Sequence, residues 1–86
     1  MGLIKNVARG HLMRDMKRTL KTADTMDSGH LINRIAAYHD YHEHGEKTGD
    51  AELALRATAA IAAADMVLRF RGVEYKLVDK RDSTNP

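Results

Sequence analysis

The stretch 51-AELALRATAAIAAADMVLRF-70 decides the fold of this chain. Fifteen of its twenty residues are apolar, and eight of those are alanine. At the 100° per residue of an α-helix, these apolar side chains fall into two stripes on roughly opposite sides. We call them the inner stripe, which comprises Leu53, Ala57, Ala60, Ile61, Ala64, Val67 and Leu68, and the outer stripe, which comprises Leu55, Ala59, Ala62, Ala63, Met66 and Phe70.

A helix that is apolar on two sides must be covered on both, whereas an ordinary surface helix has a single apolar stripe. Two other helices of the same chain could in principle supply both covers. The alternative is that a second copy of the chain covers the outer stripe, where small side chains let two helix axes approach closely. Because a symmetric dimer is the commonest oligomer, we expect a homodimer that associates through the outer stripe.

The composition describes one small globular domain. The chain has 86 residues, of which 43% are hydrophobic and 30% charged, and we expect a single helical domain over residues 1–79 with a frayed tail over residues 80–86. The absence of cysteine excludes disulfides, zinc-thiolate sites and thiol catalysis, and fits a cytoplasmic protein. Four charged residues interrupt the best candidate for a membrane-spanning helix, so no membrane association is expected; they are Glu52, Arg56, Asp65 and Arg69.

Two helices are predicted before the alanine-rich stretch. The first covers residues 2–23, and we expect a kink or break near Gly10 because the apolar phase changes across that glycine. The second begins after Asp27 or Ser28 as N-cap and runs over residues 29–44, with Gly45 as its C-cap. Asp50 then caps the alanine-rich helix.

After the alanine-rich helix, the residues from Val73 to Leu77 alternate between apolar and polar side chains before Val78, which predicts a short strand. One strand cannot form a sheet by itself, so it must pack flat on the helices, pair with a second copy or pair with a partner's edge. The predicted fold class is therefore mainly α: a small three-helix bundle, with its first helix broken near Gly10, and a short C-terminal β-strand.

A set of basic residues shares one side of the first predicted helix, opposite its methionine and leucine side chains. A helix face of one sign concentrates positive potential and attracts phosphates or acidic protein surfaces. An acidic protein surface is the favoured partner, and a nucleic acid is the alternative. The face could also have no partner and serve only to keep a small protein soluble. We call this set the basic face; it comprises Arg14, Lys17, Arg18 and Lys21.

The segment HDYHEHGE, residues 39–46, holds three of the five histidines. His39 and His42 are three residues apart, a spacing at which two imidazoles on one helix face can share a metal ion. A catalytic zinc needs a third protein ligand, and the sequence has no HExxH or comparable motif. The alternative is that these histidines border the core, or that their cationic forms are stabilised by the helix dipole near the C-terminal end of the helix.

The sequence offers no catalytic motif. It contains no glycine-rich phosphate loop, no nucleophile elbow and no paired-carboxylate motif, so we expect neither an enzyme nor a bound cofactor. The leading hypothesis is a small regulatory protein that self-associates and binds another macromolecule through the basic face. The alternatives are a nucleic-acid-binding module that uses the same face and a helical protein that binds metal through His39 and His42.

Overall fold

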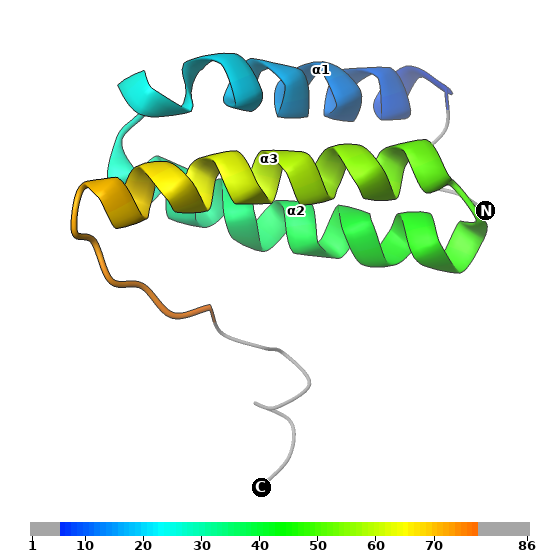
Figure 1. Cartoon of the computed structure of the whole chain (residues 1–86). Helices are drawn as coiled ribbons and strands as arrows, with labels where there is room; N and C mark the ends of the chain where they lie inside the picture. Colours follow the sequence, from blue (N-terminus) through cyan, green and yellow to red (C-terminus); the bar gives the residue numbers. More distant parts are fainter. Residues whose placement is uncertain (1–5, 78–86) are drawn as a thin grey trace, which may run out of the picture.

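The computed structural model describes residues 6–77 of the chain, and within them three helices form a bundle. They are α1 (Asn6–Thr22), α2 (Ser28–Thr48) and α3 (Ala51–Phe70), and a short 3₁₀ helix, η1 (Ala23–Thr25), connects α1 to α2. The helices α1 and α3 run in the same direction, and α2 runs opposite to both (Figure 1). The predicted mainly helical, three-helix architecture is confirmed.

The core is organised around α3, because α1 and α2 each pack mainly on α3 rather than on each other. The inner stripe forms the α3 side of this core, as predicted, and five of its seven residues are fully buried. Ile61 and Val67, its two larger β-branched residues, are only partly covered. From the other helices the largest fully buried side chains are Met16, Leu31, Ile35 and Tyr38.

The predicted break near Gly10 is wrong, because α1 continues through this residue without interruption. Gly10 is exposed, and a methyl group in place of its hydrogen would meet no atom within 4 Å. A glycine at such a position costs about 1 kcal/mol relative to alanine, which a packed helix tolerates. The change of apolar phase depended on Leu3 and Val7, whose side chains lie outside the described part of the chain.

The predicted end of the second helix at Gly45 is also wrong. The helix α2 continues to Thr48 and ends at Gly49, whose φ of 77° is the left-handed conformation that favours glycine at a helix C-cap. Gly45 instead lies buried inside α2, where an added Cβ would lie 2.9 Å from backbone atoms of Asp50 and Ala54. The predicted N-caps are confirmed: the Asp27 side chain accepts from two backbone N–H groups at the start of α2, and the Asp50 side chain accepts from the N–H of Leu53.

No strand occurs among residues 6–77, although the predicted alternation is present. Val73, Tyr75 and Leu77 are half-buried against the end of the core next to η1, and the intervening Glu74 and Lys76 are exposed. The segment therefore packs flat on the helices, one of the three arrangements that the pattern allowed. Val78 and the expected tail over residues 80–86 lie outside the described residues.

Among the described residues, none of the helices combines the length and apolar character that crossing a lipid bilayer requires.

Candidate functional site

The seam between α1 and α2 is closed by a polar network. The Asp15 carboxylate accepts from the Arg34 guanidinium and, at 2.8 Å, from the Tyr38 hydroxyl. A carboxylate only accepts, so Tyr38 is the donor in that bond and its oxygen is left to accept from Thr19, 2.7 Å away. Thr19 and Tyr38 are fully buried, and burial raises the pKa of the Tyr38 hydroxyl. The network satisfies both buried hydroxyls and neutralises Asp15.

A second ion pair joins the start of α1 to the start of α3. The Arg9 guanidinium donates to both carboxylate oxygens of Asp50, at 2.7 and 3.0 Å, and to Glu52 at 2.9 Å. The hydrogen bonds from Arg9 hold the pKa of the Asp50 carboxyl below its usual range, and the N–H of Leu53 that Asp50 caps adds to this effect. Arg9 is therefore engaged by the protein's own acids and is not part of the basic face.

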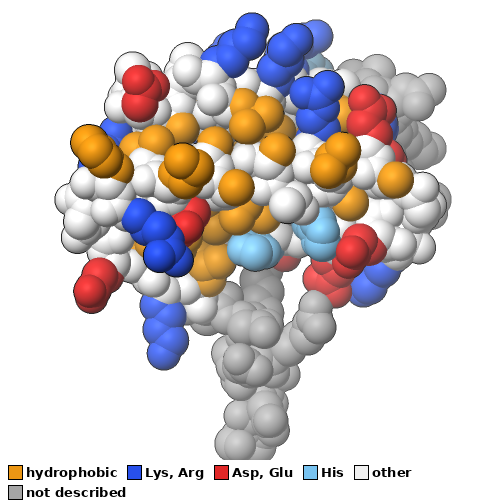
Figure 2. All heavy atoms as spheres, in the orientation of Figure 1, with side chains coloured by type: hydrophobic (Ala, Val, Ile, Leu, Met, Phe, Trp, Pro, Cys, Tyr) orange, Lys and Arg blue, Asp and Glu red, His pale blue; other side chains and the backbone are white. Residues whose placement is uncertain are grey.

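The basic face is exposed along α1, as the sequence predicted from its helical spacing. Among the described residues, Arg14, Lys17, Arg18 and Lys21 form no ion pair with any acidic side chain. In Figure 2, blue Lys and Arg side chains project from the edge of the molecule that α1 forms. The structure thus places all four predicted residues on one solvent-facing surface.

The outer stripe is the most exposed apolar surface of the described residues. Leu55 is 71% exposed, Met66 is 70% exposed and Phe70 is 93% exposed, and the alanines between them are exposed or half-buried. Figure 2 shows orange hydrophobic side chains at the surface along α3, the helix that lies across the middle of the view. The helices α1 and α2 therefore cover the inner stripe of α3 and leave its outer stripe to solvent.

The histidine segment does not assemble a metal site in the described part of the chain. His39 is exposed, and His42 is half-buried with its Nε2 3.7 Å from a carboxylate oxygen of Glu46. No three His, Cys, Asp or Glu side chains of residues 6–77 are arranged to hold a metal ion together. The two predicted ligands therefore acquire no third ligand from the described residues.

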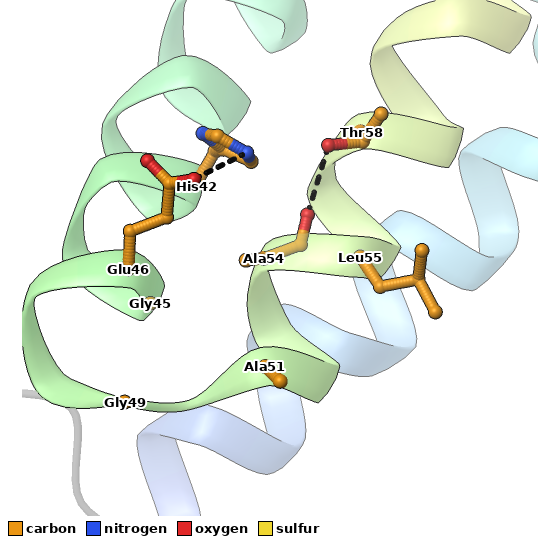
Figure 3. Close-up of a pocket in the computed structure, with 8 residues that line it drawn as sticks. All are labelled: His42, Gly45, Glu46, Gly49, Ala51, Ala54, Leu55 and Thr58. Atoms are coloured by element: carbon orange, nitrogen blue, oxygen red, sulfur yellow. Dashed lines mark hydrogen bonds and ion pairs between the residues drawn. The ribbon is translucent and has the colours of Figure 1, made fainter.

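A shallow groove lies beside the hairpin between α2 and α3 (Figure 3). His42 and Glu46 form its α2 side, and they point toward each other in the close-up. On its α3 side the hydroxyl of Thr58 donates to the carbonyl oxygen of Ala54 at 3.1 Å, so its proton is engaged by the helix backbone. The groove combines small side chains with one imidazole and one carboxylate; its full lining is His42, Gly45, Glu46, Gly49, Ala51, Ala54, Leu55 and Thr58.

The segment that follows α3 is attached to it by a third polar cluster. The Tyr75 hydroxyl donates to Asp65 at 2.6 Å, and Arg69 donates to the other oxygen of the same carboxylate at 2.7 Å. Burial and the hydrogen bond to Asp65 raise the pKa of Tyr75 to about 12. The bond from Tyr75, and then that from Arg69, lower the pKa of Asp65.

Sequence reasoning found the basic face and the outer stripe, but it missed the ion pairs that determine which charges remain available. Arg9 and Asp50 are 41 positions apart, and Asp15 and Arg34 are 19 positions apart. No spacing rule within a single helix connects residues at such separations. Comparison with known proteins supplies no relative, since no protein-family model, curated protein or solved structure matches the chain.

Proposed function

We propose that this protein is a small non-enzymatic interaction protein, which binds an acidic surface of another protein through the basic face and self-associates through the outer stripe. The observation that carries the proposal is the set of four exposed cations on α1 for which the described residues offer no acidic partner. Asp15 is the only acidic residue in the first 22 positions, and it is held by Arg34. It therefore does not offset the charge of the basic face.

The spacing of the basic face makes its charges act together. Arg14 and Lys21 are two helical turns apart, which corresponds to about 10 Å along the axis. This span is close to the Debye length of about 8 Å at physiological ionic strength, so neighbouring charges reinforce one another before salt screens them. Such a surface accelerates association with an acidic partner and disfavours basic ones.

An acidic protein surface fits this face better than a nucleic acid does. A helix that reads mixed DNA sequences presents amide or hydroxyl side chains beside the Arg and Lys that contact guanine, and single strands stack on aromatic rings. The basic face comprises Arg and Lys alone, with neither group among its members. It could contact phosphates and, through Arg or Lys, the edges of guanines, but it has no amide side chain to read adenine and no aromatic ring to stack on a base.

The test is an affinity capture from a lysate of the source organism, analysed by mass spectrometry. Wild type is compared with Arg14→Glu/Arg18→Glu and with a control of equal charge change, Lys47→Glu/Lys76→Glu. Both control lysines are exposed and lie outside α1, and the pair of Lys47 with Glu43 is an exposed i,i+4 pair of little energetic value. Folding of each variant is checked by circular dichroism.

We expect proteins captured by wild type to be retained by the control and lost from the basic-face variant. Equal capture by all three chains would show that the basic face binds no partner. Capture that disappears when the lysate is treated with nuclease, and duplex DNA binding that weakens steeply with salt, would assign the face to nucleic acid instead.

A further inference from the structure

The outer stripe has the size and pattern of a surface that fits a second copy of itself. A fully exposed Phe presents about 200 Å², so Leu55, Met66 and Phe70 at their observed exposures present on the order of 500 Å², as large as the largest apolar patch of a typical monomer. Two such surfaces in contact bury on the order of 1,000 Å², at the lower limit for a specific interface. A reversible dimer that forms at micromolar concentration is the assembly this area supports.

We infer that two copies pack through α3 in antiparallel orientation, with Ala62 and Ala63 at the crossing point. In this register Ala62 faces Ala63 of the partner subunit, Ala59 faces Met66 of the partner subunit, and Leu55 faces Phe70 of the partner subunit. Each of these pairs occurs twice, because a two-fold interface brings the same surface of both copies together. The whole outer stripe is used, and no apolar residue in it is left without a counterpart.

The order of side-chain sizes favours the antiparallel arrangement. Two crossing helices are closest at one point and diverge on both sides of it. The antiparallel register places alanine against alanine at that point, alanine against methionine one turn away and leucine against phenylalanine at each end. A parallel pair would place Phe70 and Met66 against their own copies toward one end and Leu55 against its own copy at the other, so the two ends would be filled unequally. The antiparallel pair also aligns the two helix dipoles favourably.

This arrangement has a consequence for the basic face, and that consequence rests on the proposed function. The helix α1 lies along one edge of α3, and α2 lies along the other and behind it (Figure 1). The two-fold axis of an antiparallel pair reverses the direction of α3 but leaves the α1 edge and the α2 edge of each copy on the same sides of the interface as in the other copy. Both copies of α1 therefore lie on the same edge of the dimer, where two basic faces form one larger positive surface. A parallel pair would place them on opposite edges.

Sedimentation velocity tests whether the dimer exists. The chain of 9.6 kDa is expected to move from the monomer mass toward twice that mass as its concentration rises from about 2 to about 200 µM. Met66→Glu is expected to weaken the dimer at least about tenfold, and Ala36→Glu, on the exposed surface of α2, is the matched control. Because Met66 is largely exposed in the monomer, the variant keeps the helical circular dichroism of wild type. A monomer at 200 µM, as would result if another part of the same chain covered the stripe, overturns the inference.

Disulfide trapping tests the orientation, and the natural absence of cysteine makes each introduced thiol unambiguous. Ala59→Cys mixed with Met66→Cys is expected to give a mixed disulfide dimer, whereas Ala59→Cys alone gives little. Efficient self-linking of Ala59→Cys would establish a parallel pair and overturn the antiparallel one. Ala62→Cys is the positive control for contact, and Ala36→Cys measures random collision.

The dimer and the proposed partner binding can fail separately. Arg14→Glu/Arg18→Glu is expected to dimerise like wild type, because α1 lies outside the α3 contact. Met66→Glu is expected to capture the same partners as wild type but to release them faster, because one basic face replaces two. Loss of dimerisation by Met66→Glu with an unchanged rate of partner release would refute only the shared surface, and capture by Arg14→Glu/Arg18→Glu equal to that of wild type, with its dimers intact, would refute only partner binding through the basic face.

Discussion

Gly45 and Gly10 are both inside helices, yet replacing each with alanine is expected to change stability in opposite directions. Neither has a positive φ, since the only described glycines with one are Gly49 and Gly72. The backbone conformation therefore allows alanine at both positions. What differs is the space: a Cβ at Gly10 meets nothing within 4 Å, whereas one at Gly45 lies 2.9 Å from both the nitrogen of Ala54 and the carbonyl oxygen of Asp50.

The contact at Gly45 cannot be relieved by a side-chain rotation, because both atoms belong to the backbone of α3 or its cap. The carbonyl of Asp50 accepts the N–H of Ala54, and the N–H of Asp50 donates to the carbonyl of Gly45 at 2.7 Å. Adding a methyl group must therefore push the first turn of α3 away from α2 and stretch this connection. Overpacking of this kind costs about 1–3 kcal/mol, and rigid backbone neighbours place Gly45→Ala near the upper value.

The gain in helix propensity from glycine to alanine is about 1 kcal/mol at either position. Gly10→Ala is thus expected to raise the free energy of unfolding by up to about 1 kcal/mol. Gly45→Ala is expected to lower it by a net value of about 2 kcal/mol. For a domain of this size each kcal/mol corresponds to about 4–8 °C in Tm, so the two variants should melt on opposite sides of wild type.

Thermal and urea unfolding, followed by circular dichroism at one fixed protein concentration, measure both variants. The fixed concentration is needed because self-association raises the apparent stability. Gly45→Ala with a Tm equal to or above that of wild type would refute the close approach of α2 and α3. Gly10→Ala with a lower Tm would refute a continuous α1 at that residue.

Two further predictions concern the buried and half-buried tyrosines. Tyr38→Phe is expected to lower the free energy of unfolding, measured in urea, by about 1–3 kcal/mol because the buried Thr19 hydroxyl loses its partner. Adding Thr19→Val should restore part of that loss. A double variant less stable than Tyr38→Phe would contradict this reasoning. Tyr75→Phe is expected to raise the pKa of Asp65 toward its ordinary value, as measured by NMR titration of the carboxyl carbon, because the bond from Tyr75 is the largest cause of its depression. The lowered pKa of Asp65 stabilises the folded protein at pH values above the pKa of this carboxyl in the unfolded chain, and this stabilisation is lost as the pH falls. The raised pKa of Tyr75 stabilises the folded protein below about pH 10, and this stabilisation is lost as the pH rises toward about 12. The stability difference between wild type and Tyr75→Phe should therefore shrink at both extremes, and a difference that stays constant below pH 4 would contradict the role of Asp65.

The parts of the fold that depend on local chemistry could be predicted from the sequence. Asp50 is predicted as one N-cap and Asp27 or Ser28 as the other, because a short polar side chain before a helical pattern satisfies N–H groups of the first turn that follows it. The inner stripe was likewise expected from spacing alone. The same local reasoning misplaced the end of α2, since Gly45 and Gly49 both suit a C-cap and only the approach of α3 decides between them.

The candidate surfaces show the same division. Spacing on one helix predicted that Arg14, Lys17, Arg18 and Lys21 share a face, and the structure exposes all four. Spacing could not predict that Arg9, on the same helix, is engaged by the start of α3. It also left two possible covers for the outer stripe, because only the packed positions of α1 and α2 determine which side of α3 they cover.

The network of Asp15, Arg34 and Tyr38 connects stability to the direction in which the basic face points. The helix α1 rests on α3 through apolar side chains, which by themselves tolerate some rotation of a helix about its own axis. Hydrogen bonds are directional, so the bonds from Arg34 and Tyr38 to Asp15 fix that rotation from the α2 side. Asp15 is one residue from Arg14 and three from Arg18, on a neighbouring side of the same helix. The hydrogen bonds that satisfy the buried Tyr38 hydroxyl therefore also keep the cations of the basic face directed toward solvent. A variant that loosens this network should weaken partner capture even where the protein remains folded.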